Sequence, residues 1–290
     1  LAKKLPDLAM NWKAEEKDIT SYRFYSRPSA PLTLDTEKPV LGAIDTAFGE
    51  NCNLRCRMCT PGQSNKLRID DKFFRENKTP GRPFYLAGWN DKKLTDPSAV
   101  AFFSEEVMQF KDLLKPHPTI RLLRATGGET LRTNGFQMFV DNAIENNIAS
   151  ETTLAYHTNA AKFTDDIVEK LKLFKANQPT FSIDSVGKSY EYIRHPMPWA
   201  MLEKSVENYI TKVPTPTIDL NAALSVMNLH YVPELCAWFK EKIKLAGTPV
   251  ECRVNIDPVW PIGRPIDISW LPRPMLESQI PRIMEAKQQF

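Results

Sequence analysis

The stretch "GAIDTAFGENCNLRCRMC", residues 42–59, joins a short apolar run to three closely spaced cysteines. Its first part, residues 42–48, is rich in apolar residues and predicts a β-strand. Cys52, Cys56 and Cys59 follow at spacings of four and three residues, in a chain that has 5 cysteines. The three thiols are therefore expected on the loop at the C-terminal end of the first strand.

Three thiols without a nearby fourth ligand fit a metal group that keeps one position open. Structural zinc takes four ligands, usually as two close pairs. The other cysteines, Cys236 and Cys252, do not form a second pair, and no histidine is close in the sequence. Packing in a core is a poor explanation, because polar residues such as Asn53 and Arg55 alternate with the cysteines. An iron–sulfur cluster that performs chemistry on a further molecule fits the pattern better.

The composition narrows the class of protein. The chain has 290 residues, of which 42% are hydrophobic and 25% charged, and a formal net charge of +3. Such values are typical of a soluble globular protein, and the charge is too small to indicate a nucleic-acid partner by itself. No apolar run is long enough to span a membrane, and "LAKKLPDLAM" lacks the apolar core of a signal peptide. A cytoplasmic location, where thiols stay reduced, is therefore expected, without a membrane partner.

Apolar, β-branched runs alternate with amphipathic segments along most of the chain. Strands are predicted at 42–48, 119–125, 152–157, 180–184, 218–226 and 250–256, and helices near 100–114, 134–147, 164–175, 199–212 and 233–245. Repeated βα units predict an α/β fold with a parallel sheet. From the pattern alone, this sheet is either open and doubly wound or a barrel, complete or partial.

Three further segments complete the expected domain organisation. Residues 1–40 form an N-terminal extension, and residues 64–98 form a charged, aromatic-bearing insertion within the α/β domain at 41–256. Residues 257–290 are rich in proline and predict an irregular C-terminal extension that ends in a helix near 275–288.

The CxxxCxxC spacing on the loop after the first strand resembles the signature of radical S-adenosylmethionine (radical SAM) enzymes. The resemblance implies a partial (β/α)6 TIM-like barrel with parallel strands over residues 41–256. It also implies that Cys52, Cys56 and Cys59 hold a 4Fe-4S cluster whose open iron is chelated by SAM. In that family the reduced cluster cleaves SAM, and the resulting 5′-deoxyadenosyl radical abstracts a hydrogen from the substrate. The cofactor thus carries the chemistry while the protein orients it.

Further motifs resemble the SAM-binding segments of this family. "ATGGET", residues 125–130, resembles its GGE motif, with Thr130 in place of the usual proline. "YHTNA" (156–160), "FSIDS" (181–185) and "YEYIRHP" (190–196) follow in the expected order. The resemblance implies cofactor contacts from Gly127, Gly128, Glu129, Asn159, Ser182, Asp184 and Arg194, and adenosine or adenine contacts from Asn228 and Met58. In particular, it pairs Glu129 with the SAM ammonium and Arg194 with the SAM carboxylate, which the planar guanidinium matches.

Within the family, "SID…YEYIRHPMPW" is similar to the branch that modifies peptides and carries a SPASM or twitch extension. This similarity implies a peptide or protein substrate and an external electron donor that resembles flavodoxin or ferredoxin. Cys236 and Cys252 are expected to be core residues, so the ligands of any auxiliary cluster would lie outside this chain. No catalytic acid or base is assigned, and the sequence does not identify the substrate.

Two other functions remain open at this stage. A binding or redox-sensing protein would hold the cluster without cleaving SAM, and a nucleic-acid-modifying enzyme would use the same chemistry on a different substrate. Basic residues and Phe73 and Phe74 in the insertion at 64–98 suit nucleic acid, but acidic residues among them favour a solvated loop. The aromatic residues of the insertion also predict that it lies over the SAM-side mouth of the barrel and contributes to substrate selection.

Overall fold

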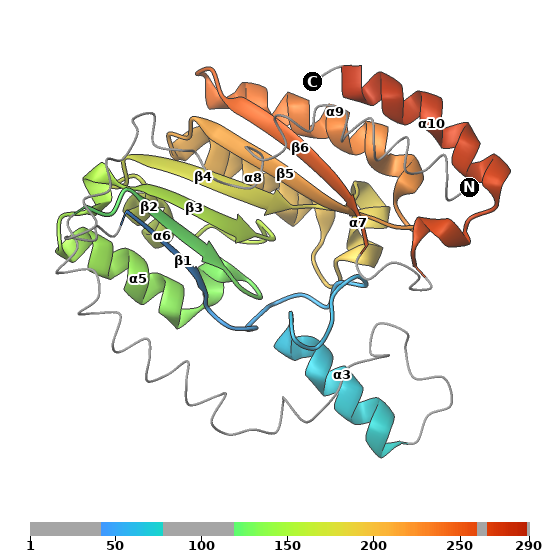
Figure 1. Cartoon of the computed structure of the whole chain (residues 1–290), viewed down its shortest axis with the longest axis horizontal. Coiled ribbons are helices and arrows are strands. Elements are labelled where there is room, and N and C mark those ends of the chain that lie inside the picture. The colour runs from blue at the N-terminus through green and yellow to red at the C-terminus, as the bar shows by residue number, and fades with distance from the viewer. Residues whose placement is uncertain (1–41, 78–118, 260–265, 289–290) are drawn as a thin grey trace, which may run out of the picture. The chain divides into compact units, whose positions relative to one another are not determined.

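The structure is a computed structural model, and it describes residues 42–77, 119–259 and 266–288 (Figure 1). All of these residues belong to one compact unit, Leu41–Phe290. The N-terminal extension, the predicted helix at 100–114 and residues 78–98 of the insertion lie outside the described residues.

Six parallel strands form a single sheet in the order β1-β2-β3-β4-β5-β6. Their bounds are Ala43–Ala47 (β1), Leu122–Thr126 (β2), Thr153–Thr158 (β3), Ala176–Ser182 (β4), Thr217–Leu224 (β5) and Glu251–Pro258 (β6). A doubly wound sheet would reverse its strand order at a switch point, whereas here each strand pairs with the next in sequence. The predicted partial (β/α)6 TIM-like barrel is therefore confirmed, and its strand C-termini share one end (Figure 1).

Four of the described helices lie where the sequence predicts them, one ends early near residue 175, and those at residues 65–76 and 187–193 were not predicted. They are Asn65–Glu76 (α3), Asn134–Glu145 (α5), Asp165–Leu171 (α6), Gly187–Ile193 (α7), Trp199–Lys212 (α8), Val232–Ile243 (α9) and Arg273–Gln288 (α10). No helix within the described ranges is long and apolar enough to cross a membrane.

The boundary between α6 and β4 was predicted wrongly. Strand β4 begins at Ala176, four residues before the predicted start at 180, and α6 ends correspondingly early. The segment "ANQP" contains polar residues and a proline, which usually mark turns. Asn177 is nevertheless buried, because its Nδ2 donates to the carbonyl of Leu171 at 2.8 Å. This hydrogen bond to the end of the preceding helix satisfies the amide nitrogen of a residue that the sequence pattern assigns to a turn.

The apolar core lies between the helices and one face of the sheet. Leu123, Leu154, Phe181 and Leu220 project from adjacent strands into one buried cluster with side chains of α5, α6, α8 and α9. The cluster includes Phe136, Phe139, Ile167, Val168, Leu202, Val206, Leu235 and Phe239. Alternate strand residues reach opposite faces, so the other face of the sheet carries a different set of side chains.

That other, inner face of the sheet carries rows of polar side chains from β3 to β6. One row of register partners crosses β3, β4, β5 and β6 and consists of His157, Thr180, Asp219 and Arg253. Ser182, Asn221 and Asn255 form a second row, closer to the strand C-termini. Asp219 accepts a hydrogen bond from Arg253 Nε at 3.0 Å. The barrel thus has an apolar outside that packs on helices and a polar inside.

The loop after β1 docks on the loop after β2 through a close approach of two backbones. Gly128 N donates to the carbonyl of Gly49, and Glu129 N donates to the carbonyl of Asn51, each at 2.8 Å. A Cβ atom at Gly128 would lie 2.6 Å from the carbonyl carbon of Glu50 and 2.8 Å from the oxygen of Asn51. Only glycine allows this approach. The glycines of "ATGGET" therefore hold the cysteine loop in place.

Gly128→Ala is predicted to destabilise the fold, because the new methyl group must displace the backbone of residues 50 and 51. Overpacking of this kind costs about 1–3 kcal/mol. The measurement is the free energy of unfolding in urea. Gly42→Ala is the matched control, since a Cβ at Gly42 meets nothing within 4 Å. Equal stabilities of the two variants would contradict the close approach.

Candidate functional site

The cysteine loop is held from two sides at the C-terminal end of the barrel. On one side it meets residues 127–129, as described above. On the other side, the N–H groups of Arg55 and Arg57 donate to the carbonyls of His195 and Ile193 at 2.7 and 2.9 Å. These bonds flank Cys56, so the loop is paired with the chain that leaves α7. Ser64 Oγ adds a bond of 2.7 Å to the carbonyl of Leu54.

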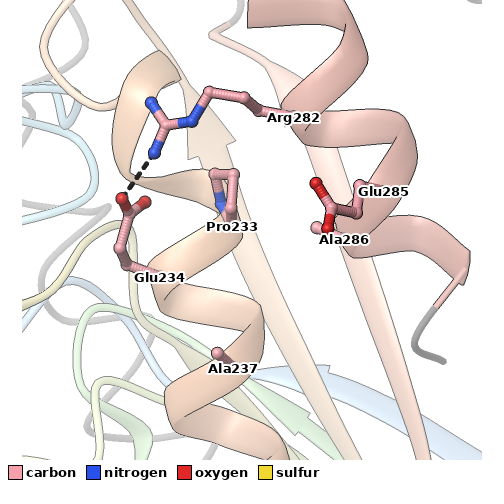
Figure 2. A pocket seen from close by; sticks show the side chains of 6 residues that line it. All are labelled: Pro233, Glu234, Ala237, Arg282, Glu285 and Ala286. Carbon is pink, nitrogen blue, oxygen red and sulfur yellow. Dashed lines mark hydrogen bonds and ion pairs between the residues drawn. The ribbon is translucent and has the colours of Figure 1, made fainter.

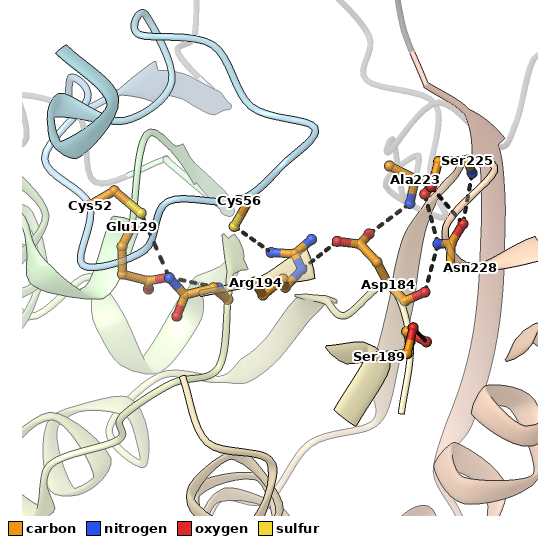
Figure 3. A network of polar contacts seen from close by, with 11 residues as sticks. Cys52, Cys56, Glu129, Asp184, Ser189, Arg194, Ala223, Ser225 and Asn228 are labelled. Carbon is orange, nitrogen blue, oxygen red and sulfur yellow. Dashed lines mark hydrogen bonds and ion pairs between the residues drawn. The ribbon is translucent and has the colours of Figure 1, made fainter. Parts of the chain in front are cut away.

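The three thiols lie within the protein and receive polar contacts. Cys52 and Cys56 are buried, and Cys59 is partly buried. Asn159 Nδ2 approaches Cys52 Sγ at 3.8 Å. Arg194 Nη1 approaches Cys56 Sγ at 3.9 Å (Figure 3). N–H groups directed at sulfur stabilise the thiolate, the form that binds metals.

Burial and charge act on the thiols in opposite directions. The pKa of Cys52 is raised to about 11, chiefly by burial. The charge of Arg194 opposes this rise in pKa. A hydrogen bond between the side chains of Cys56 and Cys59 raises the pKa of Cys56 and lowers that of Cys59. Arg194 lowers the pKa of all three cysteines. Its guanidinium is thus the positive group that favours thiolates in this loop.

Glu129 is buried beside the cysteine loop, with its carboxylate fixed by three donors. Oε1 accepts from Thr158 Oγ1 at 2.6 Å and from Leu131 N at 3.3 Å, and Oε2 accepts from Asn159 N at 2.7 Å. Burial raises the pKa of Glu129, and the three donors oppose that rise. A carboxylate has about four acceptor positions, so Oε2 keeps one for a further donor.

Arg194 and Asp184 form a buried ion pair in the middle of the site. Arg194 Nε donates to Asp184 Oδ2 at 2.5 Å, and Asp184 Oδ1 accepts from Ala223 N at 2.8 Å. Asp184 follows β4, Ala223 belongs to β5, and Arg194 follows α7. The pair therefore joins two strand ends to the group that faces Cys56 (Figure 3). Both residues were predicted as SAM contacts, and here they contact each other.

The remaining predicted residues differ in their surroundings. Asn228 is fully buried, and its amide donates to the carbonyls of Asp184 and Ala223 while its Oδ1 accepts from Ser225 N and Oγ. All of its hydrogen-bonding positions are thus used within the chain. Met58 packs in an apolar cluster with Ile193. The contact of these two residues with adenosine remains a prediction.

Two neighbours of the site were not anticipated. Thr158 holds Glu129, although it was read only as part of "YHTNA". Asn65 Oδ1 accepts from Cys52 N at 3.1 Å across the start of α3. The sequence offers a signal for Thr158, because it is the last residue of β3 and directly precedes Asn159. Its side chain therefore lies at the end of the strand where a barrel site is built. No local pattern marks Asn65.

Several charged residues in the described part of the insertion form ion pairs, either within it or with the cysteine loop. Arg68 pairs with Glu50, Arg55 with Asp70 at 3.1 Å, and Lys72 with Glu76 at 3.7 Å. This pairing supports the solvated alternative over a nucleic-acid surface. Helix α3 begins at the cysteine loop, since Asn65 N donates to the carbonyl of Glu50 at 2.9 Å. That the whole insertion at 64–98 lies over the mouth of the barrel remains a prediction.

A cavity of about 320 Å³ lies elsewhere, between α9 and α10 (Figure 2). Its lining consists of Pro233, Glu234, Ala237, Arg282, Glu285 and Ala286, and an ion pair of 2.6 Å joins Glu234 to Arg282. None of the predicted site residues lines it. Cys236 is buried nearby with Val232 and Ala286, as expected of a core residue.

Comparisons with known proteins give matches at the level of fold. No family model matches the chain, and no curated protein matches it. Among solved structures, anSMEcpe with bound AdoMet aligns at a TM-score of 0.51 and 13% identity over 84% of this chain and 60% of that chain. SuiB from Streptococcus suis bound to precursor peptide SuiA aligns at a TM-score of 0.50 and 14% identity. This alignment covers 98% of this chain and 60% of that chain.

SuiB bound to S-adenosylmethionine aligns at a TM-score of 0.48 and 14% identity, over 86% of this chain and 48% of that chain. This chain thus spans between about half and three fifths of the solved chains. At these identities the likeness to anSMEcpe and to peptide-bound SuiB, with TM-scores of 0.51 and 0.50, shows the fold, in agreement with the six-stranded partial barrel.

Proposed function

We propose that this chain is a radical SAM enzyme that holds a 4Fe-4S cluster through Cys52, Cys56 and Cys59. The observation that carries the proposal is the placement of these thiols. They lie on one loop at the C-terminal end of a partial barrel, beside a buried glutamate and a buried arginine. Active sites of βα barrels are built at this end.

The donor set fits a cluster with an open iron better than a single ion. Within residues 42–77, 119–259 and 266–288, no three His, Cys, Asp or Glu side chains are placed to hold one metal ion. Each thiolate of an iron–sulfur cluster binds its own iron, so convergence on one point is not required. The N–H groups of Asn159 and Arg194 near the sulfurs are donors of the kind that tune such clusters.

The side chains around the loop suit the amino-acid part of SAM. When bound, the cluster and SAM together supply reductive cleavage of SAM and hydrogen abstraction from a substrate. The free acceptor position on Glu129 Oε2 is available to the SAM ammonium. Within the described part of the chain, Nη2 of Arg194 makes no hydrogen bond, which leaves it for the carboxylate. Asp184 orients that guanidinium, and Asn159 connects Glu129 to the cysteine loop.

We propose a peptide or protein as the substrate. The inner face of the barrel presents amides and hydroxyls, among them Ser182, Asn221 and Asn255. Such groups both donate and accept hydrogen bonds, as a peptide backbone requires. The likeness to SuiB, solved with a precursor peptide, supports the same substrate class.

The finer assignments come from the sequence. The SPASM or twitch branch and a flavodoxin- or ferredoxin-like electron donor follow from the family resemblance, whereas a cytoplasmic location follows from the cysteine content and the domain boundaries at residues 40 and 256 from the pattern of the chain. Cys236 lies in α9 and Cys252 in β6, both away from the cysteine loop, and neither is offered as a ligand of a second cluster.

Substitution of a loop cysteine is predicted to abolish the cluster. Anaerobically reconstituted wild-type protein should contain about four irons and four sulfides per chain, since one cysteine group ligates one cluster. Cys52→Ala, Cys56→Ala or Cys59→Ala should lose them, whereas Cys236→Ala and Cys252→Ala, the controls, should keep them. Iron retained after loss of a loop cysteine would contradict the assignment.

Glu129→Gln is predicted to weaken SAM binding while the iron content stays at the wild-type level. The substitution keeps the shape of the side chain but removes a charge-assisted partner worth about 1.5–3 kcal/mol. Isothermal titration of the reconstituted protein with SAM measures the affinity, and the exposed Glu151→Gln is the control. Arg194→Ala is a less specific variant, because it also leaves Asp184 buried without its ion-pair partner. Unchanged SAM affinity in Glu129→Gln would refute the role of this residue.

A further inference from the structure

One buried tyrosine beside the site has a hydroxyl without a partner among the described residues. Tyr190 has no exposed surface, and within residues 42–77, 119–259 and 266–288 its OH makes no hydrogen bond. Tyr156 and Tyr209, which are buried as completely, pair with each other at 3.0 Å, and Tyr209 also pairs with Thr215 at 3.1 Å. Because an unpaired buried hydroxyl costs folding free energy, the isolated hydroxyl of Tyr190 requires an explanation.

The position of Tyr190 relates it directly to the cysteine loop. It lies one helical turn before Arg194, whose N–H donates to the Tyr190 carbonyl at 2.8 Å. Tyr190 also belongs to the same buried cluster as Cys52 and Cys56, the cysteine that Arg194 approaches. The edge of its ring meets Trp199 at 5.3 Å between ring centroids, which restricts its rotation. The phenol is thus a rigid group next to the candidate site.

The electrostatic surroundings favour a hydrogen-bond donor. Burial raises the pKa of Tyr190, and the negative charges of Cys56, Asp184 and Glu129 raise it further, against the opposing effect of Arg194. The phenol therefore keeps its proton and offers it to an acceptor. The action of these four charged groups on Tyr190 agrees with its place in the buried cluster that contains Cys52 and Cys56.

We infer that Tyr190 is a positioning residue whose hydroxyl donates a hydrogen bond to an anionic acceptor of the bound cofactors. The acceptor is a sulfur of the cluster or a carboxylate oxygen of SAM. The inference rests on the proposed function. It explains the unpaired hydroxyl as a group whose partner enters with the cofactors, at a site where charge-assisted hydrogen bonds are about twice as strong as neutral ones.

Tyr190→Phe tests the inference, with Tyr209→Phe as the matched control. In the cofactor-free protein, Tyr190→Phe removes an unpaired hydroxyl and should not lower the thermal midpoint. Tyr209→Phe breaks two hydrogen bonds and should lower it by about 2–4 °C. A loss in Tyr190→Phe as large as that in Tyr209→Phe would show a structural partner and overturn the inference.

Measurements on the reconstituted protein identify the acceptor. If it is a cluster sulfur, Tyr190→Phe lowers the reduction potential measured without SAM, because a donor to sulfur stabilises the more negative reduced form. If it is the carboxylate, the potential is unchanged and SAM binds on the order of tenfold more weakly. Tyr209→Phe should change neither quantity.

The failures of the two proposals are distinguishable. A wild-type protein that takes up neither cluster nor SAM would overturn the proposed function and this inference with it. A wild type that binds both, together with a Tyr190→Phe variant of the same potential and the same SAM affinity, would overturn the inference alone.

Discussion

The buried ion pair between Arg194 and Asp184 connects the parts of the site. Desolvation of two charges is costly, and such a pair is retained at low cost only when further hydrogen bonds satisfy its atoms. Here Asp184 also accepts from the backbone of β5, and the chain around Arg194 pairs with the backbone on both sides of Cys56. One interaction therefore fixes the ends of β4 and β5, the exit of α7 and the central cysteine relative to one another.

The same arrangement places opposite charges where the proposed chemistry requires them. Arg194 favours thiolates at all three cysteines, and Glu129 sits across the loop with one acceptor position left. The loop itself is held by a glycine that no other residue can replace without displacing the backbone of Glu50. Thiols, carboxylate and guanidinium are thus brought together by the backbone of the loop as much as by their own contacts.

Much of this fold follows from local patterns in the sequence. Apolar, β-branched runs marked the strands, and the place of the cysteines directly after the first of them marked the end of the barrel where the site lies. The early start of β4 was not predicted, because "ANQP" has the composition of a turn, whereas in the structure Asn177 donates to the carbonyl of Leu171 at the end of α6. Patterns likewise identified Arg194 and Asp184 but not their mutual pairing. Tyr190 stands out only when its burial and its missing partner are known.

The division between an apolar outer face and a polar inner face bears on the substrate. Side chains on the inner face hold polar groups in register across β3 to β6, beside the strand ends that carry Asp184 and Glu129. A substrate lying against these rows would approach the cysteine loop along hydrogen-bonding groups. This geometry suits a polar chain better than an apolar small molecule.

The most direct test of the account is the electron paramagnetic resonance spectrum of the reduced, reconstituted protein, recorded before and after addition of SAM. An iron without a protein ligand binds SAM directly, so the account predicts that SAM changes the g-values of the cluster signal. A cluster signal that is identical with and without saturating SAM would contradict the open coordination position, and with it the proposed chemistry.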